Sequence, residues 1–255
     1  MRTKVLLSLV VSTAAVMLTG IIPAHAQDAT YARTYAVTPK DGMVAQFEAA
    51  LQTHSRWRNE NNDPWTWGTS TVEVGENLGQ YRIRSAGHSW ADFDSYDAGF
   101  GPEGLVHWNA TVAPLVQSIS STITTANLAI SNRPPAGRAT AFVNISRFQL
   151  RPSRGDGFVE LQLTAVEILK EHNFGGYWVF SSPVLGGGPG PSMSLVSFYT
   201  NWADMAGPNP TFEAIMIQAL GQDGFMEWTN ELGETYREVE SITLRMRPDL
   251  GVNQN

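Results

Sequence analysis

The tripeptide Trp90-Ala91-Asp92 returns as Trp202-Ala203-Asp204, and this repetition underlies our prediction of the fold. Each copy follows a pattern typical of a strand and precedes a pattern typical of a helix. The copies are about 112 residues apart, which indicates a duplicated domain because solenoid repeats recur every roughly 20 to 50 residues. We therefore predict that the chain contains one module twice.

The first module, residues 27–131, is predicted to have the element order β-α-β-β-α-β. A β-rich run ends at Pro39, and a helical pattern begins at Asp41. A second helix is expected from Ser89, and Pro114 should kink it because proline lacks an N–H group. The expected strands are 31–37, 65–74, 80–85 and 122–130.

The second module, residues 139–250, repeats this order. Its helices are expected to end at His172 and to begin at Trp202. The proline-rich segment 132–138 is predicted to be a short, stiff linker, and 251–255 a disordered tail. The expected strands are 141–150, 177–182, 193–200 and 240–247.

The first 26 residues are typical of a signal peptide. Arg2 and Lys4 precede an apolar run, and Ala24-His25-Ala26 has the small residues that a signal peptidase accepts. We predict cleavage before Gln27 and a periplasmic or secreted protein. An uncleaved membrane anchor is the alternative, but Pro23 and the small-residue ending favour cleavage. No membrane association is expected after cleavage.

Net charge and cysteine content indicate which kinds of binding partner and which kinds of chemistry to expect. The formal charge of −7 becomes −9 when the two leader cations are removed, and such an acidic surface repels nucleic acid. The chain has no cysteine, which excludes disulfides, thiol nucleophiles and cysteine metal sites. We expect a small-molecule ligand, no nucleic acid, and a monomer or a homo-oligomer.

A β-α-β-β-α-β chain folds into an antiparallel sheet with both helices on one face, so the other face needs a cover. Two copies in one chain can cover each other. In this element order and duplication the chain resembles the dimeric α+β barrel superfamily, in the tandem form that carries both ferredoxin-like halves. The resemblance implies an α+β fold whose two antiparallel sheets pair into a barrel, with a ligand cavity between a helix layer and its sheet. The superfamily includes cofactor-free monooxygenases of aromatic compounds and haem-degrading and haem-dependent enzymes.

His54 is the candidate catalytic residue. It lies on the apolar stripe of the first helix with Phe47 and Leu51, so it should face the sheet where the resemblance implies a cavity. An imidazole there can act as a base or an axial ligand, and the alternative is a core histidine bonded to a carbonyl. Arg58 continues the stripe and is expected to pair with Asp63 or with a bound carboxylate.

Five further residues complete the candidate ligand-binding set. Trp65 and Trp67 share one strand face and can stack on an aromatic ligand or serve as packing. Trp108 lies on the apolar stripe of the second helix. Arg82 and Arg84 also share a strand face, and inside a barrel they need either an anionic ligand or buried carboxylates. We favour an ion network inside the barrel.

The remaining histidines are interpreted structurally. His107 and Asn109 flank Trp108, but consecutive helix residues point about 100° apart, so we carry over no haem-degrading role to this triplet. His172 ends a helix, where a cationic imidazole meets the dipole, and His88 is expected to face solvent. No metal site and no cofactor are predicted, and haem is the one cofactor that the residues leave open.

Two functions follow from these residues. The first, which the sequence favours, is an exported barrel protein that binds a small, largely apolar or aromatic ligand without catalysis. The second is a cofactor-independent oxygenase or isomerase-like enzyme that acts on an aromatic or quinonoid substrate near His54. An enzyme requires His54 to share a cavity with another polar group within hydrogen-bond reach, whereas a binding protein allows His54 to be sealed in packing.

Overall fold

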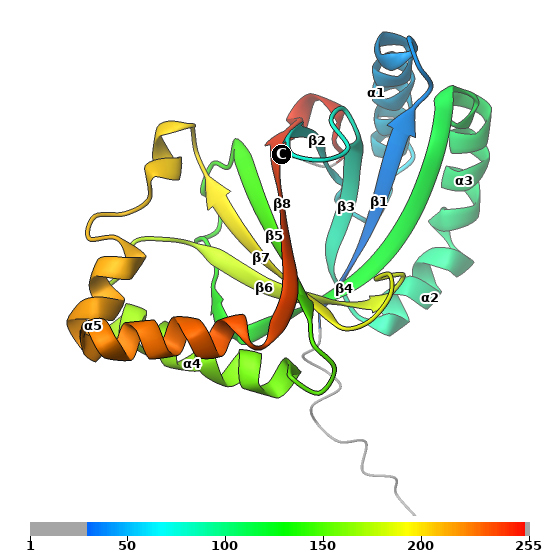
Figure 1. Ribbon diagram of the computed structural model, residues 1–255. Coiled ribbons are helices and arrows are strands. Elements are labelled where there is room, and N and C mark those ends of the chain that lie inside the picture. The colour runs from blue at the N-terminus through cyan, green and yellow to red at the C-terminus, as the bar shows by residue number, and fades with distance from the viewer. Residues whose placement is uncertain (1–29, 253–255) are drawn as a thin grey trace, which may run out of the picture.

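The computed structural model describes residues 30–252 and shows a closed β-barrel with helices packed outside it (Figure 1). Eight strands form the barrel in the order β1-β3-β2-β8-β5-β7-β6-β4, and every neighbouring pair is antiparallel. The α+β class and the barrel agree with the expectation. The predicted signal peptide, residues 1–26, lies outside the described residues. No helix between residues 30 and 252 has the length and apolar character needed to cross a bilayer.

The first part of the chain supplies four strands, with three helices on their outer face. The strands are β1 (Tyr31–Pro39), β2 (Gly68–Val74), β3 (Tyr81–His88) and β4 (Val116–Asn132). The helices are α1 (Val44–Glu60), α2 (Trp90–Ala98) and α3 (Phe100–Thr111).

The second part supplies the other four strands and two long helices, which lie together on the opposite side of the barrel (Figure 1). The strands are β5 (Phe142–Leu150), β6 (Trp178–Leu185), β7 (Ser192–Tyr199) and β8 (Tyr236–Met246). The helices are α4 (Gly155–Glu171) and α5 (Phe212–Gly233).

Two strand pairs join the parts. β2 pairs with β8, where Ser70 is opposite Met246, and β4 pairs with β6, where Ile123 is opposite Leu185. Because both joins are backbone ladders, neither part has a free sheet edge at these positions. Each sheet therefore shields the inner face of the other, as the sequence analysis requires.

The apolar cores lie mainly between the helices and the outer faces of the strands. Phe47 and Tyr81 belong to the cluster beneath α1, α2 and α3. Phe158 and Phe180 belong to the cluster beneath α4 and α5. A third, smaller cluster around Leu244 lies where β2, β5 and β8 meet.

The repeated tripeptide begins a helix only in the first part. The Ser89 hydroxyl accepts a hydrogen bond from the Asp92 N–H, and the Asp92 carboxylate accepts one from the Ser89 N–H, a capping box that starts α2. In the second part a 3₁₀ turn over Ala203–Ala206 follows Trp202, and α5 begins only at Phe212. Gly207 and the nearby prolines interrupt the helix that the sequence predicts.

Two other boundaries differ from expectation. α3 ends at Thr111, and Pro114 lies in a 3₁₀ turn before β4 instead of kinking a continuous helix. Val252, which the sequence analysis places in a disordered tail, is buried and pairs with Trp67. The C-terminal segment is therefore part of the first core up to this residue, and residues 253–255 lie outside the described range.

Candidate functional site

A cavity of about 430 Å³ lies between α1, α3 and the sheet of the first part. Its lining is largely apolar, because α1 and α3 present apolar stripes to the strands. Arg33, Arg58 and Asp97 are the charged residues of the lining, and His54 is its histidine. The apolar and aromatic lining includes Tyr35, Leu51, Trp67, Ile83, Tyr96, Trp108 and Leu250.

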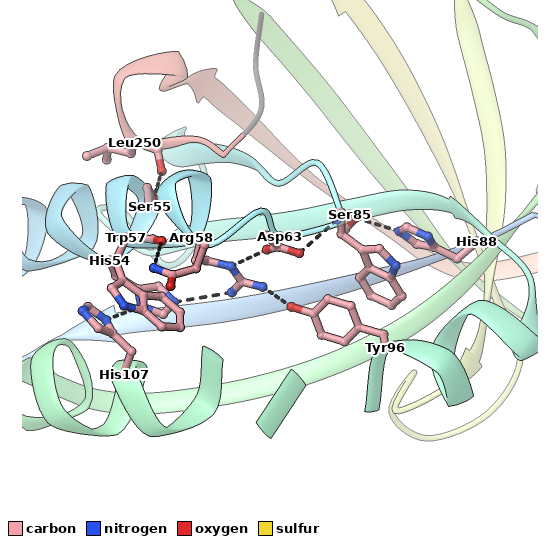
Figure 2. Close-up of polar contacts among 12 residues, drawn as sticks. His54, Ser55, Trp57, Arg58, Asp63, Ser85, His88, Tyr96, His107 and Leu250 are labelled. Carbon is pink, nitrogen blue, oxygen red and sulfur yellow. Dashed lines mark hydrogen bonds and ion pairs between the residues drawn. The ribbon is translucent and has the colours of Figure 1, made fainter. Parts of the chain in front are cut away.

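His54 is buried with only 2% of its surface exposed, and it contacts a second histidine. Its Nδ1 lies 2.9 Å from Nδ1 of His107, which comes from α3 (Figure 2). The ring of Trp57 stacks on His107 with centroids 4.4 Å apart and supports its orientation. The two helices thus join a buried imidazole to one that is partly exposed.

Arg58 connects His54 to two further polar groups (Figure 2). Its Nη1 lies 3.4 Å from Nε2 of His54, its Nε donates to Asp63 at 2.5 Å, and its Nη2 donates to the Tyr96 hydroxyl. The guanidinium also lies over the Trp67 ring, 4.9 Å from its centroid. The cation is therefore held by a carboxylate, a hydroxyl and an aromatic face.

The chain reversal after α1 explains why Asp63 reaches Arg58. Asn62 adopts a left-handed conformation at φ 56°, and the Asp63 N–H donates to the Arg58 carbonyl at 3.0 Å. The Asp63 side chain is fully buried, and its second oxygen accepts a hydrogen bond from the Trp65 N–H. The expected Arg58–Asp63 pair is present, and it is buried.

The surroundings keep His54 neutral. Burial, the nearby Arg58 cation and His107 together lower the pKa of His54 to about 3. Burial also lowers the pKa of His107, and it raises the pKa of Tyr96 to about 12. At neutral pH the site thus contains neutral His54, a protonated Tyr96 hydroxyl and the Arg58 cation.

These contacts define the direction of the hydrogen bonds. A guanidinium only donates, so Nε2 of His54 accepts from Arg58. Nδ1 of His54 then carries the hydrogen and donates to Nδ1 of His107. The resulting series of hydrogen bonds runs from Arg58 through His54 to His107, and Arg58 and His54 line the cavity. It satisfies the geometric criterion for an enzyme, which is a second polar group within reach of His54 in a shared cavity.

The structure brings together four of the seven predicted site residues. His54, Arg58, Trp67 and Trp108 line the cavity. Trp65 does not line it, because its ring is covered by His88 and Tyr96 at centroid distances of 3.7 and 4.0 Å. Trp65 is therefore a packing residue beneath the site.

Arg82 and Arg84 lie on the other face of β3. Ile83 between them lines the cavity, so the two arginines point into the barrel. Arg84 donates to the hydroxyls of Thr34 and Thr124 at 3.0 and 3.3 Å. Neither arginine forms an ion pair with any residue between 30 and 252, so the expected ion network is wrong. At Arg84, threonine hydroxyls take the place of the expected carboxylates.

His88 and His172 belong neither to the hydrogen-bond series of Arg58, His54 and His107 nor to the cavity lining. His88 is buried instead of facing solvent, because it hydrogen bonds to Ser85 at 2.7 Å and stacks on Trp65. His172 follows α4, and its Nδ1 lies 2.9 Å from the Ile168 carbonyl. Its role at a helix end agrees with the sequence interpretation.

Sequence reasoning missed His107 and Tyr96. His107 was set aside because it flanks Trp108, yet Trp108 and His107 both reach His54. No local pattern indicates this contact, because 53 residues separate the two histidines. Tyr96 follows Phe93 by three residues on the buried side of α2, and this spacing is the signal that was available.

The haem chemistry of some superfamily members was tested against the donors present. Nδ1 of His54 is held by His107, and the Arg58 guanidinium, 3.4 Å from Nε2, opposes the binding of an iron cation at that nitrogen. No histidine is among the described residues that line a second cavity, beneath α4 and α5. The described part of the chain also contains no cluster of three or more metal-ligating side chains. We derive no step through haem.

Comparison with known proteins identifies the fold. No family model matches the sequence, and no curated protein is significantly similar to it. Among solved structures, proteins described as putative monooxygenases from Lactobacillus acidophilus and Fusobacterium nucleatum superpose with TM-scores of 0.53 and 0.56 at 8% and 10% identity. The aligned regions cover 89% and 86% of this chain and 98% and 92% of the other chains. A mutant chlorite dismutase from Candidatus Nitrospira defluvii gives a TM-score of 0.52 at 8% identity, over 86% of this chain and 92% of its own.

These structures superpose on most of this chain, so the expected α+β barrel is confirmed as a fold. At such low identities the likeness shows the fold alone.

Proposed function

We propose that this chain is a cofactor-independent oxygenase that removes a proton from an aromatic or quinonoid substrate in the first cavity. The observation that carries the proposal is the series of hydrogen bonds that joins Arg58, His54 and His107. Arg58 and His54 line an aromatic-walled cavity of about 430 Å³. That volume is within the range of small-molecule sites. The two bacterial proteins described as monooxygenases have the same fold, and the proposal extends that description to this chain.

The two histidines act as a proton relay. A substrate whose acidic hydrogen points at Nε2 of His54 replaces the long, 3.4 Å contact with Arg58 and transfers its proton to Nε2, while Nδ1 of His54 passes its own proton to Nδ1 of His107. His54 ends in its other neutral tautomer and the positive charge lies on His107. This matters because the pKa of His54, about 3, disfavours a cation on the buried ring.

Arg58 stabilises the anion that deprotonation creates. The guanidinium lies at the same nitrogen that accepts the proton, so the developing negative charge forms next to a fixed cation. Asp63 and Tyr96 hold the guanidinium in place. Electron-rich aromatic anions react with dioxygen directly, so dioxygen is the oxidant and the reaction needs no resident cofactor.

Anthrone, a tricyclic aromatic ketone with an acidic C–H group, is the probe that tests the proposal. Anthrone and dioxygen give anthraquinone and water, so product absorbance and oxygen uptake report the same reaction. We expect oxidation by the wild type, a loss of about 10²- to 10⁴-fold in kcat for His54→Ala, and a smaller loss for His107→Asn. Oxidation that is equally fast in wild type and His54→Ala contradicts the relay.

His172→Ala is the matched control, because it removes a histidine that lies outside the cavity lining. It should leave the rate of anthrone oxidation unchanged. Binding without turnover is the second candidate function, and the pKa of His54, well below neutral, is the observation that favours it. Wild-type protein that binds anthraquinone but does not oxidise anthrone supports this second function.

We also propose that the chain arose by tandem duplication and that it is exported. The recurrence of Trp-Ala-Asp supports duplication, as do the strand orders β4-β1-β3-β2 and β8-β5-β7-β6 in the two parts. The cation-flanked apolar run before Ala24-His25-Ala26 supports export to the periplasm or beyond. The mass of the mature protein tests cleavage before Gln27.

A further inference from the structure

The second part of the chain contains a larger cavity, of about 710 Å³, between its helices and strands. It lies beneath α4 and α5, on the side of the barrel away from α1 and α3 (Figure 1). The apolar lining includes Phe148, Leu169, Phe174, Trp178, Phe180 and Leu195. Its volume matches that of sites for small organic ligands.

Gln162 is the one amide side chain among the described residues of this lining, whose other polar members include Ser197 and Thr211. It lies on the buried face of α4 among Phe158, Ala165 and Val166, with 9% of its surface exposed. Its side-chain amide forms no hydrogen bond with any residue in the described range 30–252, and the residue lines the cavity. The amide is accessible from the cavity and has no partner there among the described residues, so this position points to a ligand that hydrogen bonds to it.

The charges at this cavity are already satisfied at its rim. Arg138 and Asp204 are the charged residues of the lining, and their side chains lie 3.9 Å apart. Asp204 also accepts a hydrogen bond from the Thr200 N–H, and the Arg138 guanidinium lies over the Tyr177 ring. A charged ligand would find no free counter-ion in the interior, which favours a neutral one.

We propose that the second cavity binds a neutral fused-ring aromatic alcohol whose hydroxyl hydrogen bonds to the amide of Gln162. A hydroxyl both donates and accepts, as does a glutamine amide, so one ligand group satisfies both ends of the side chain. The aromatic walls bury the rings. This inference is independent of the oxygenase activity, because it concerns a different cavity and residues of different helices.

Binding of 2-naphthol and naphthalene to the full chain tests the proposal. Titration calorimetry measures both affinities, and isotope-edited NMR detects contacts between the ligand ring and the Ala165 methyl group, which lines the cavity. We expect both probes to contact Ala165. In Gln162→Leu, which keeps a similar volume, 2-naphthol should bind about tenfold more weakly, while the affinity for naphthalene stays within about twofold.

Gln149→Leu is the matched control, because its amide bonds to Pro189 and Pro191 carbonyls away from the cavity, and it should change neither affinity. The proposal is overturned if the probes do not contact Ala165, or if Gln162→Leu weakens naphthalene as much as 2-naphthol. Anthrone oxidation is measured separately. Failure of the ligand proposal for the second cavity therefore does not affect the oxygenase proposal for the first cavity, and failure of the oxygenase proposal does not affect the ligand proposal.

Discussion

The two cavities of this barrel lie beneath equivalent helix layers but differ in chemistry. The first is the smaller, at about 430 Å³, and joins Arg58 to a pair of hydrogen-bonded histidines. The second, at about 710 Å³, presents one unpartnered amide, from Gln162, in an apolar wall. The same architecture thus supports a site suited to proton transfer and a site suited to neutral recognition.

Residues at corresponding helix positions account for much of this difference. α1 places His54 and Arg58 on its buried stripe, whereas α4 has Ala165, Val166 and Leu169 on its own. Burial and the neighbouring Arg58 guanidinium lower the pKa of the His54 imidazole, whereas an amide does not titrate. A fold shared by two sites therefore does not predict a shared function.

The largest expected effects test whether the two parts are one folding unit. Phe47 and Phe158 are both completely buried, one in each core. Phe47→Ala and Phe158→Ala should each lower the free energy of unfolding by about 3 to 5 kcal/mol. Because the barrel is closed by ladders between the parts, calorimetry should show one transition in both variants. Two separate transitions, with only one moved by each variant, would show that the parts unfold independently.

The next largest effect concerns the ion pair of the first site. Asp63→Ala leaves the Arg58 guanidinium, whose side chain is 13% exposed, without its carboxylate, so the free energy of unfolding should fall by about 3 kcal/mol. Urea denaturation measures the change. Glu73→Ala is the control, because the Glu73–Arg245 pair is more exposed and should contribute less than about 1 kcal/mol. Equal losses in the two variants would contradict the assigned burial.

A smaller expected effect is the pH dependence of the free energy of unfolding, which His54 in the first cavity contributes to and Gln162 in the second does not. The folded pKa of His54, about 3, is below the ordinary value of 6.5, so the folded protein binds fewer protons than the unfolded chain. The contribution of His54 to the free energy of unfolding is therefore fully present above pH 6.5 and is lost as the pH falls toward 3. Between pH 6.5 and 5.5 the loss is about 1 kcal/mol.

The variant His54→Gln should lose that contribution in urea titrations at the two pH values. The pKa values of His88 and His107 are also lowered, so part of the pH dependence persists in the variant. Gln162→Leu, in the second cavity, should keep the full wild-type dependence. An unchanged profile in His54→Gln would refute the neutral buried imidazole.

The smallest expected effect is a gain of stability in the second cavity. Gln162→Leu replaces a cavity-facing amide that has no partner among residues 30–252 by an apolar side chain within an apolar wall, so the free energy of unfolding should rise by about 0.5 to 1 kcal/mol in the absence of ligand. Gln149→Leu breaks two hydrogen bonds and should lower it by a similar amount. A destabilised Gln162→Leu would mean that the amide has a structural role.

Sequence patterns predicted helices correctly where the signal lay within a few neighbouring residues. The α1 stripe correctly placed His54 and Arg58 toward the sheet, because helical periodicity is a property of neighbouring residues. The helix start at Trp90 was also correct, since its capping box lies within four residues. The helix expected at Trp202 was displaced to Phe212 because Gly207 and the prolines after it dominate over the repeated tripeptide.

Contacts between distant segments were beyond such patterns. The His54–His107 hydrogen bond depends on how α1 packs against α3, and the wall supplied by Leu250 and Val252 depends on the return of the C-terminal segment to the first core. Gln162 was not singled out, because one glutamine on a helix has no unusual spacing. Its meaning arises from the cavity in front of it.

Periodicity and turn residues predicted the order of strands and helices, because these signals come from residues close together in the chain. The barrel with helices outside was expected from the internal repeat together with the resemblance to the α+β barrel superfamily. The chemistry of the two cavities came from packing. Whether an imidazole meets another imidazole, a guanidinium or an empty space depends on distances between side chains far apart in sequence, and those distances exist only once the barrel has closed.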